Sequence, residues 1–240
     1  KISKLGKKKL IKNNVLILNS SEDEMKVIEE YQTDLFYTQN EAINKLVSHF
    51  EGNETVHFYL RVHPNLGKVK NIQTEEVNQM DYKNLTVIGP NQLVDTYAIM
   101  DECDKSIVFG STAGIEATYW GNASILLGKS FYYYLEDTCY KPNSYEELFE
   151  LISTKQLTPK SQEACLPYGY YFSTYGIKTK YFDFDGLNNS TFKSKRIRKW
   201  NLMTVKYLFK YSTNISKWFV AYKALIGKRL NLKDIFRFKY

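Results

Sequence analysis

The stretch that decides the fold is Ser106-Ile107-Val108-Phe109-Gly110-Ser111-Thr112-Ala113-Gly114-Ile115-Glu116-Ala117. An apolar β-type run over 106–109 leads through glycine and two hydroxyl residues into a helix that we predict over 112–120. Gly110 permits a tight turn, and Gly114 permits the close approach of a ligand or of another backbone. A buried strand that is followed, after a few small residues, by a helix is typical of an α/β protein.

The same alternation recurs on both sides of this stretch. Strand-like runs occur at 15–19, 57–62, 85–88 and 124–127, and helical spacing occurs at 39–50, 93–100 and 144–152. We therefore predict an α/β fold over residues 1–155, a Rossmann-like parallel sheet with helices on both faces. Residues 156–192, rich in Tyr, Gly and Ser, are predicted to be an irregular connecting segment, and residues 193–240 a basic amphipathic helical tail.

Composition narrows the class of protein. The chain has 240 residues of which 43% are hydrophobic, enough for a sizeable core. Its three cysteines form no CxxC pair, which indicates a reducing compartment without structural zinc. No apolar run is long enough to predict a transmembrane helix, and no signal peptide is recognised. Because the sequence begins at Lys1 rather than Met, we expect it to be part of a longer protein.

The net charge of +7 is unevenly distributed. Residues 193–240 hold fourteen basic side chains and one acid, a net of +13, whereas the other 192 residues hold nineteen basic and twenty-five acidic side chains, a net of −6. Aromatic and aliphatic residues recur in the basic segment at helical spacing. This pattern favours binding to an anionic membrane surface. Packing on another part of the protein is an alternative, and nucleic acid is the least favoured partner.

The helix start after Gly110 is the first candidate binding site. Ser111 or Thr112 is placed to cap the helix, and the free N–H groups of a first turn, with the helix dipole, favour a phosphate. Ala113 and Gly114 have small side chains or none, so a phosphate can come close to the backbone of this first turn. The competing interpretation is an ordinary helix cap whose small residues serve packing.

A second candidate is Arg61-Val62-His63-Pro64-Asn65, at the end of a predicted strand. The proline holds His63 in an extended conformation, which would project the imidazole over the sheet edge toward a phosphate or a leaving-group oxygen. Arg61 would hold a phosphate or pair with an acid. The alternative for His63 is a structural bond to a loop carbonyl.

Two further candidates contain acidic side chains. Ser20, Ser21 and Glu22 follow the first strand and are suited to ribose hydroxyls or an acceptor, although Ser21 with Glu24 also reads as a helix start. Glu116 lies one helical turn after Thr112 and would reach a ribose, or else pair with Arg61.

The sequence lacks the motifs of P-loop ATPases, dinucleotide dehydrogenases, zinc proteases and GxSxG hydrolases.

Three pieces of the sequence, in this order, resemble bacterial capsule and surface polysaccharide glycosyltransferases of the GT-B fold. They are the 20–24 loop, the 61–65 loop, and Val94–Ala98 followed by Gly110–Ala117. The resemblance spans roughly residues 13–150 and includes the Gly128–Tyr134 stretch. A His-Pro pair with a Ser-Thr-Ala-Gly-Ile-Glu-Ala helix start at this spacing is fairly specific. The resemblance implies that the chain is the C-terminal, nucleotide-sugar-binding half of such an enzyme.

The resemblance also implies the chemistry. His63, Ser111 and Thr112 would contact the nucleotide phosphate, with His63 as the catalytic residue. Neither metal nor cofactor is expected, because the nucleotide-sugar is itself the substrate, and the catalytic base would lie in an N-terminal domain that the sequence does not contain. The expected acceptor is a glycan or glycolipid, and the expected location is the cytoplasmic face of the cell membrane. Rival functions are a teichoic-acid-type polyol-phosphate transferase and a non-catalytic binding protein of the same fold.

Overall fold

The computed structural model describes residues 13–25, 33, 35–176, 180–184 and 190–196. The chain divides into two compact units, residues 1–175 and 176–240, and each is described by itself. The first unit contains every candidate site residue predicted above. Its backbone alternates strands and helices from Asn13 to Thr174, as the sequence predicts for an α/β protein.

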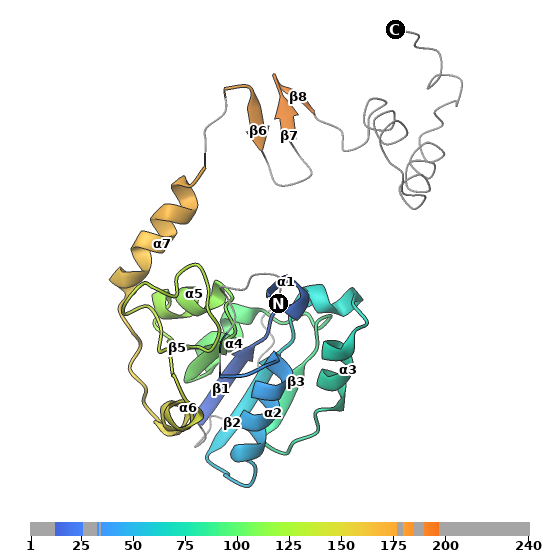
Figure 1. The fold of residues 1–240 in the computed structure, drawn as a ribbon, viewed down its shortest axis with the longest axis vertical. Helices are drawn as coiled ribbons and strands as arrows, with labels where there is room; N and C mark the ends of the chain where they lie inside the picture. The colour runs from blue at the N-terminus through green and yellow to red at the C-terminus, as the bar shows by residue number, and fades with distance from the viewer. Residues whose placement is uncertain (1–12, 26–32, 34, 177–179, 185–189, 197–240) are drawn as a thin grey trace, which may run out of the picture. The chain divides into compact units, whose positions relative to one another are not determined.

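A five-stranded parallel sheet forms the centre of the first unit (Figure 1). Its spatial order is β3-β2-β1-β4-β5, so the chain builds outward from β1 in one direction and then returns to β1's other side. The predicted Rossmann-like parallel sheet is confirmed. The strands are β1 (Asn13–Leu18), β2 (Val56–Arg61), β3 (Leu85–Ile88), β4 (Lys105–Val108) and β5 (Ala123–Leu126).

Helices cover both faces of the sheet because the strands are apolar on both sides. In β1, Val15 and Ile17 pack into one hydrophobic cluster with α2, α3 and α6, whereas Leu16 and Leu18 pack into another with α4 and α5. All four side chains are buried, so β1 is the centre of the core. The helices of this unit are α1 (Glu22–Met25), α2 (Gln39–His49), α3 (Ile72–Gln79), α4 (Thr96–Glu102), α5 (Ala113–Tyr119), α6 (Tyr145–Ser153) and α7 (Gln162–Thr174).

Helix α3 was not predicted from the sequence. Its polar stretch IQTEEVNQ buries Gln73 and Val77, too few apolar positions to give a helical signal. The helix is instead set by a capping box, in which the Asn71 side chain accepts from the Thr74 N–H and the Thr74 hydroxyl accepts from the Asn71 N–H.

The segment predicted to be irregular, 156–192, contains regular structure. Its residues 162–174 form α7, which packs beside α5 with Cys165 buried in the second hydrophobic cluster. Pro167 and Gly169 weaken a helical pattern, and burial of Cys165 against the core outweighs them. Ser161 caps the helix by accepting from the Ala164 N–H at 3.3 Å.

In the second unit, β6 (Phe182–Phe184), β7 (Ser190–Phe192) and β8 (Lys195–Arg196) form a three-stranded antiparallel sheet. Residues 193–196, the start of the predicted helical tail, are therefore turn and strand. The remainder of that tail, 197–240, lies outside the described residues.

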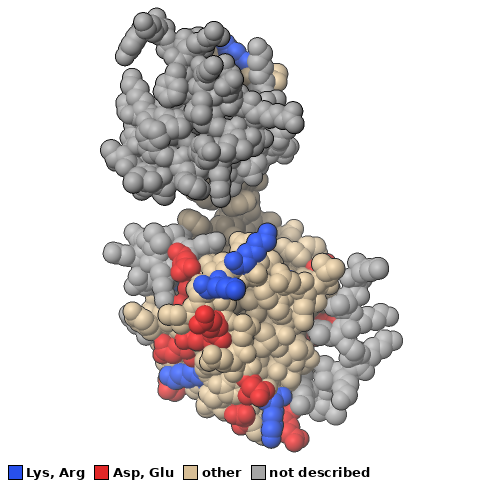
Figure 2. All heavy atoms as spheres, turned by 90° about the vertical axis from the view of Figure 1, so that its right-hand side faces the viewer, with Lys and Arg blue, Asp and Glu red and all other residues tan. Residues whose placement is uncertain are grey.

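On the part of the first unit that is coloured in Figure 2, the described Asp and Glu side chains are mixed with described Lys side chains and with uncharged residues. Within the described ranges, no helix combines the length and the apolar character needed to cross a bilayer.

Candidate functional site

The candidate site lies where the parallel strands end. Because β1, β2 and β4 are parallel neighbours, the loops that follow them meet at one edge of the sheet. After β3 the chain returns to the far side of β1, so the strand order reverses between β1 and β4. In open α/β sheets, ligands bind outside the carboxyl ends of the strands at such a reversal.

The loop after β1 begins with Asn19, whose side chain is 2% exposed. Its Oδ1 accepts a 2.8 Å hydrogen bond from the backbone N–H of His63 and so ties the loop after β2 to the end of β1. Its Nδ2 has no hydrogen-bond acceptor among the described residues. The sequence predicts Asn19 as the last residue of a strand, and its position directly after four apolar residues is the signal that points to a strand end.

Ser20 and Glu22 are held by helices. The Ser20 Oγ accepts from Gln39 Nε2 at 3.2 Å, and the Glu22 carboxylate accepts from the Gln39 backbone N–H at 2.7 Å. Glu22 therefore stabilises the first turn of α2, which was not the role predicted from the sequence. Ser21, also buried, directly precedes α1, in keeping with the helix-start alternative.

The loop after β2 presents His63, Pro64 and Asn65. His63 precedes the 3-10 helix η2 (Pro64–Lys68), and its Nδ1 accepts from the Asn65 N–H at 3.2 Å. With Nδ1 as acceptor, the neutral ring carries its proton on Nε2. The Nε2–H is then the group able to donate to a ligand oxygen at the sheet edge. Pro64 and Asn65 are exposed beside it.

Arg61, at the end of β2, is buried beneath this loop and is 6% exposed. Its guanidinium donates to the carbonyl of Gly89 at 2.5 Å and to that of Val62 at 3.3 Å. Burial lowers its pKa. The arginine thus holds the loop after β3, and no ion pair among the described residues joins it to Glu116, which excludes the pairing considered from the sequence.

The loop after β4 turns at Gly110, whose φ of 111° is in the left-handed region that favours glycine. The carbonyl of Ser111 accepts a 2.5 Å hydrogen bond from the hydroxyl of Tyr132, a fully buried side chain that the sequence analysis missed. The Ser111 Oγ accepts from the Ala113 N–H at 3.3 Å. Thr112 is exposed, and its own side chain makes no capping hydrogen bond to the first turn of α5.

Gly114 serves packing in this structure. It is buried, and a Cβ at this position would lie 2.5 Å from the Tyr132 hydroxyl and 2.6 Å from Val108 Cγ2. No larger residue fits without moving α5 away from β4. The packing alternative stated for the small residues therefore holds at Gly114, and this glycine sets the position of the helix start.

Glu116 already has a partner. Its carboxylate accepts a short 2.5 Å hydrogen bond from the hydroxyl of Tyr97 on α4. This bond and burial raise the pKa of Tyr97 to about 12. A ribose that bound Glu116 would share the carboxylate with Tyr97 or displace it.

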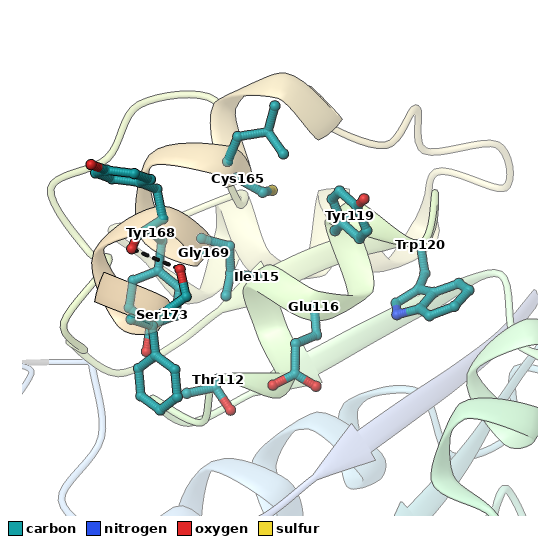
Figure 3. A pocket seen from close by; sticks show the side chains of 12 residues that line it. Thr112, Ile115, Glu116, Tyr119, Trp120, Cys165, Tyr168, Gly169 and Ser173 are labelled. Carbon is teal, nitrogen blue, oxygen red and sulfur yellow. Dashed lines mark hydrogen bonds between the residues drawn. The ribbon is translucent and has the colours of Figure 1, made fainter. Parts of the chain in front are cut away.

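An apolar groove of about 590 Å³ adjoins the site between α5 and α7 (Figure 3). Thr112 and Glu116 contribute oxygen atoms to its wall, and the other walls are mainly aromatic and aliphatic. Four of these side chains, Tyr119, Trp120, Leu166 and Phe172, are between 50% and 70% exposed. The groove was not predicted from the sequence, because more than half of its lining residues belong to α7.

The predicted residues thus form one edge with two kinds of role. His63, Ser111 and Thr112 present polar groups at the strand ends, joined by Asn19, which was not predicted. Arg61, Ser20, Glu22 and Gly114 hold loops and helices in place. Across the ranges that the structure describes, no cluster of three or more His, Cys, Asp or Glu side chains is arranged to hold a metal ion.

Sequence comparison yields no match, either to a protein-family model or to a curated protein. Solved structures are similar in shape. A β-Kdo 2,4-transferase, KpsC of Thermosulfurimonas dismutans, matches with a TM-score of 0.43 and 15% identity over 69% of this chain and 46% of its own. The UDP-GlcNAc 2-epimerase of Methanocaldococcus jannaschii matches with a TM-score of 0.43 and 13% identity, again over 69% of this chain and 46% of its own.

The KpsC β-Kdo 2,7-transferase of the same Thermosulfurimonas matches with a TM-score of 0.38 and 17% identity over 67% of this chain and 55% of its own. The chain therefore spans about half the length of these structures. At such scores and identities the similarity does not transfer an activity to this chain.

Proposed function

We propose that this chain binds a nucleotide-sugar and forms the donor-binding part of a GT-B-type glycosyltransferase that extends a surface or capsular polysaccharide or its lipid-linked precursor. One observation carries the proposal: three loops with polar groups, after β1, β2 and β4, converge where the strand order reverses. The resemblance of the same loops to capsule glycosyltransferases supports it independently of the fold.

In the proposed complex, the nucleotide phosphate lies between His63 and the start of α5. His63 Nε2–H and the hydroxyls of Ser111 and Thr112 donate to the phosphate oxygens, and the dipole of α5 favours their charge. An acceptor hydroxyl attacks the anomeric carbon while the bond from that carbon to the phosphate oxygen breaks, and the nucleotide leaves with the electron pair. The donors stabilise the negative charge that grows on the leaving group. No described residue is assigned as the base that takes the acceptor proton.

The proposal is tested by calorimetric titration of the 240-residue chain with CMP, UDP, GDP and CDP. We expect one of them to bind, and we expect His63→Ala to weaken that binding about 10- to 100-fold, since a hydrogen bond to a charged group is lost. His57→Ala is the matched control. His57 lies at the amino end of the same strand, where it contacts Thr86 Oγ1 at 2.8 Å, and its loss should leave nucleotide affinity unchanged.

The titration also decides between rival functions. If none of the four nucleotides binds, the proposal fails and a non-catalytic protein of this fold is favoured. If the full-length enzyme converts a CDP-polyol and releases CMP, mass spectrometry will show a phosphopolyol added to the acceptor, and the polyol-phosphate transferase is correct instead. Near-normal affinity in His63→Ala would remove His63 from the site.

A further inference from the structure

We propose that the groove between α5 and α7 binds the hydrocarbon chain of an amphiphilic, uncharged glycoside, which is the acceptor of the transfer. This inference rests on the proposed function, because it assigns the second substrate of the same site. The groove is named the α5–α7 groove below, and it is formed by residues of the first unit only.

The polarity of the α5–α7 groove is graded along its length. Thr112 and Glu116 bring oxygen atoms to the side nearest the start of α5. The rings of Tyr119, the last residue of α5, and Trp120, its C-cap, lie at the other end (Figure 3). On α7, Leu166 and Phe172 add apolar side chains to the wall, and Ser173 adds a hydroxyl on the side of Thr112 (Figure 3). A ligand that matches this gradient has a hydroxyl-bearing head and an apolar tail.

The charges of the wall exclude an ionic tail. None of the residues that line the α5–α7 groove is Lys, Arg or His, and the acid among them, Glu116, is already bonded to the Tyr97 hydroxyl. Ligand pockets of about 300–1,000 Å³ with mostly apolar walls and a few polar groups are typical of small-molecule sites, and a groove of about 590 Å³ lies within that range.

Side-chain contacts and hydrogen bonds connect the α5–α7 groove to the proposed donor site. Its Tyr168 packs on Tyr132 with ring centroids 5.5 Å apart, and the Tyr132 hydroxyl holds the Ser111 carbonyl. Gln162 Nε2, at the start of α7, donates to the Tyr119 carbonyl at the end of α5 at 2.7 Å. A tail bound in the groove would therefore hold its head group at Thr112, beside the proposed phosphate site, and the shared Thr112 is the reason for assigning the groove to the acceptor.

Gly169 offers a way to fill the groove without disturbing the core. It lines the groove on α7, and a Cβ at this position meets no heavy atom within 4 Å. Gly169→Phe places a ring in the groove and also replaces glycine by a better helix former. Glu163→Phe is the matched control, because it places the same ring on α7 at a position that does not line the groove.

The test is calorimetric titration of the full 240-residue chain with decyl β-glucoside, below its micelle concentration, and with methyl β-glucoside. We expect the decyl compound to bind and the methyl compound not to bind, with affinity falling about fourfold for each methylene removed from the chain. Gly169→Phe should weaken decyl glucoside binding at least about tenfold, whereas Glu163→Phe should bind like the wild type. Nucleotide affinity should be the same in all three proteins.

Two results would overturn the inference: no decyl glucoside binding by the wild type, or equal binding by Gly169→Phe. A wild-type dimer in sedimentation that Gly169→Phe converts to monomer, without glucoside binding, would assign the groove to a second copy of the chain instead. A chain that binds decyl glucoside in the groove but binds no nucleotide would refute the proposed function, and with it the acceptor role, while the hydrocarbon site would stand. The two failures are thus distinguishable.

Discussion

The two edges of the five-stranded sheet both bury polar side chains, and they satisfy them in different ways. At the amino edge, Lys105 is fully buried and its Nζ donates to the carbonyls of Leu151, Ile152 and Thr154, at 3.1, 2.9 and 2.5 Å. These are carbonyls at the end of α6, which have no partner within the helix. Burial lowers the pKa of this lysine to about 8, against the effect of the nearby Asp104.

At the carboxyl edge, two buried hydrogen-bond donors have no acceptor among the described residues. They are Asn19 Nδ2 and Arg61 Nε, although Asn40 Oδ1, at the start of α2 on the same side, is an acceptor without a donor among those residues. At the amino edge, the unsatisfied atoms of Asn13 and Asn84 are acceptor oxygens. Unpaired buried donors cost free energy unless a ligand or water accepts from them. We propose that the unpaired donors of Asn19 and Arg61 serve an oxygen-rich, anionic ligand, whereas the amino edge serves stability.

The largest effect is expected at the amino edge. Lys105→Met leaves the carbonyls of Leu151 and Thr154 without this donor, whereas the Ile152 carbonyl keeps Asn13 Nδ2. We expect the free energy of unfolding to fall by roughly 3 kcal/mol. Nucleotide affinity in the folded protein should not change. Denaturant unfolding followed by circular dichroism measures the first quantity, and calorimetry measures the second.

Lys155→Met is the control for Lys105→Met. Lys155 is exposed just after α6, and its loss should change stability by no more than about 0.5 kcal/mol. If Lys105→Met is as stable as the wild type, the amino edge does not depend on this lysine, and the contrast between the edges loses its main support.

The next effect tests the carboxyl edge. Asn19→Asp keeps an oxygen to accept from the His63 N–H but replaces the Nδ2 donor with a negatively charged oxygen. We expect nucleotide affinity to fall about tenfold or more, because the carboxylate repels a phosphate and offers it no donor. Calorimetry with the nucleotide that the wild type binds provides the measurement.

The same substitution at the other edge is the control. Asn84 is a buried asparagine that directly precedes β3, and its Nδ2 donates to the Val47 carbonyl at 2.9 Å. Asn84→Asp should lower stability and leave nucleotide affinity intact. Equal loss of affinity in both variants would mean that Asn19 acts through general stability and not through the site.

The strands and most helices of this fold follow from local pattern. Apolar runs such as 85–88 end at Gly or Pro, and the capped helix at 144–152 carries its own start signal, so both were placed correctly. Helix α3 depends on a capping box in a polar stretch, and α7 depends on burial of Cys165 against α5. Neither leaves a periodic apolar signal in the sequence.

The loops of the site were also predictable, since every parallel strand ends at the same edge. The roles of individual side chains were not. Whether Arg61 meets a phosphate, an acid or the Gly89 carbonyl depends on the order of strands in space, which no local pattern specifies. The same holds for Glu22, whose partner Gln39 is brought to it by folding.

The smallest effect concerns Glu116, a carboxylate at the carboxyl edge that is tied rather than free. Tyr97 is 48% exposed, so its hydrogen bond to Glu116 should contribute at most about 1 kcal/mol to stability. The pKa of the Tyr97 hydroxyl is raised from 10.0 to about 12 in the folded protein, so the native state holds the hydroxyl proton more tightly than the unfolded state does. The stability contributed by this hydrogen bond is therefore present below pH 10 and is lost as the pH rises to about 12.

Urea unfolding of Tyr97→Phe tests this. The variant should be less stable than the wild type at neutral pH, and the difference should disappear between pH 10 and about 12. Tyr134→Phe, at an exposed tyrosine, should show neither change. A Tyr97→Phe difference that persists at high pH would show that the hydroxyl stabilises the protein by packing rather than through Glu116, and the carboxylate would then be available to a ribose from the start.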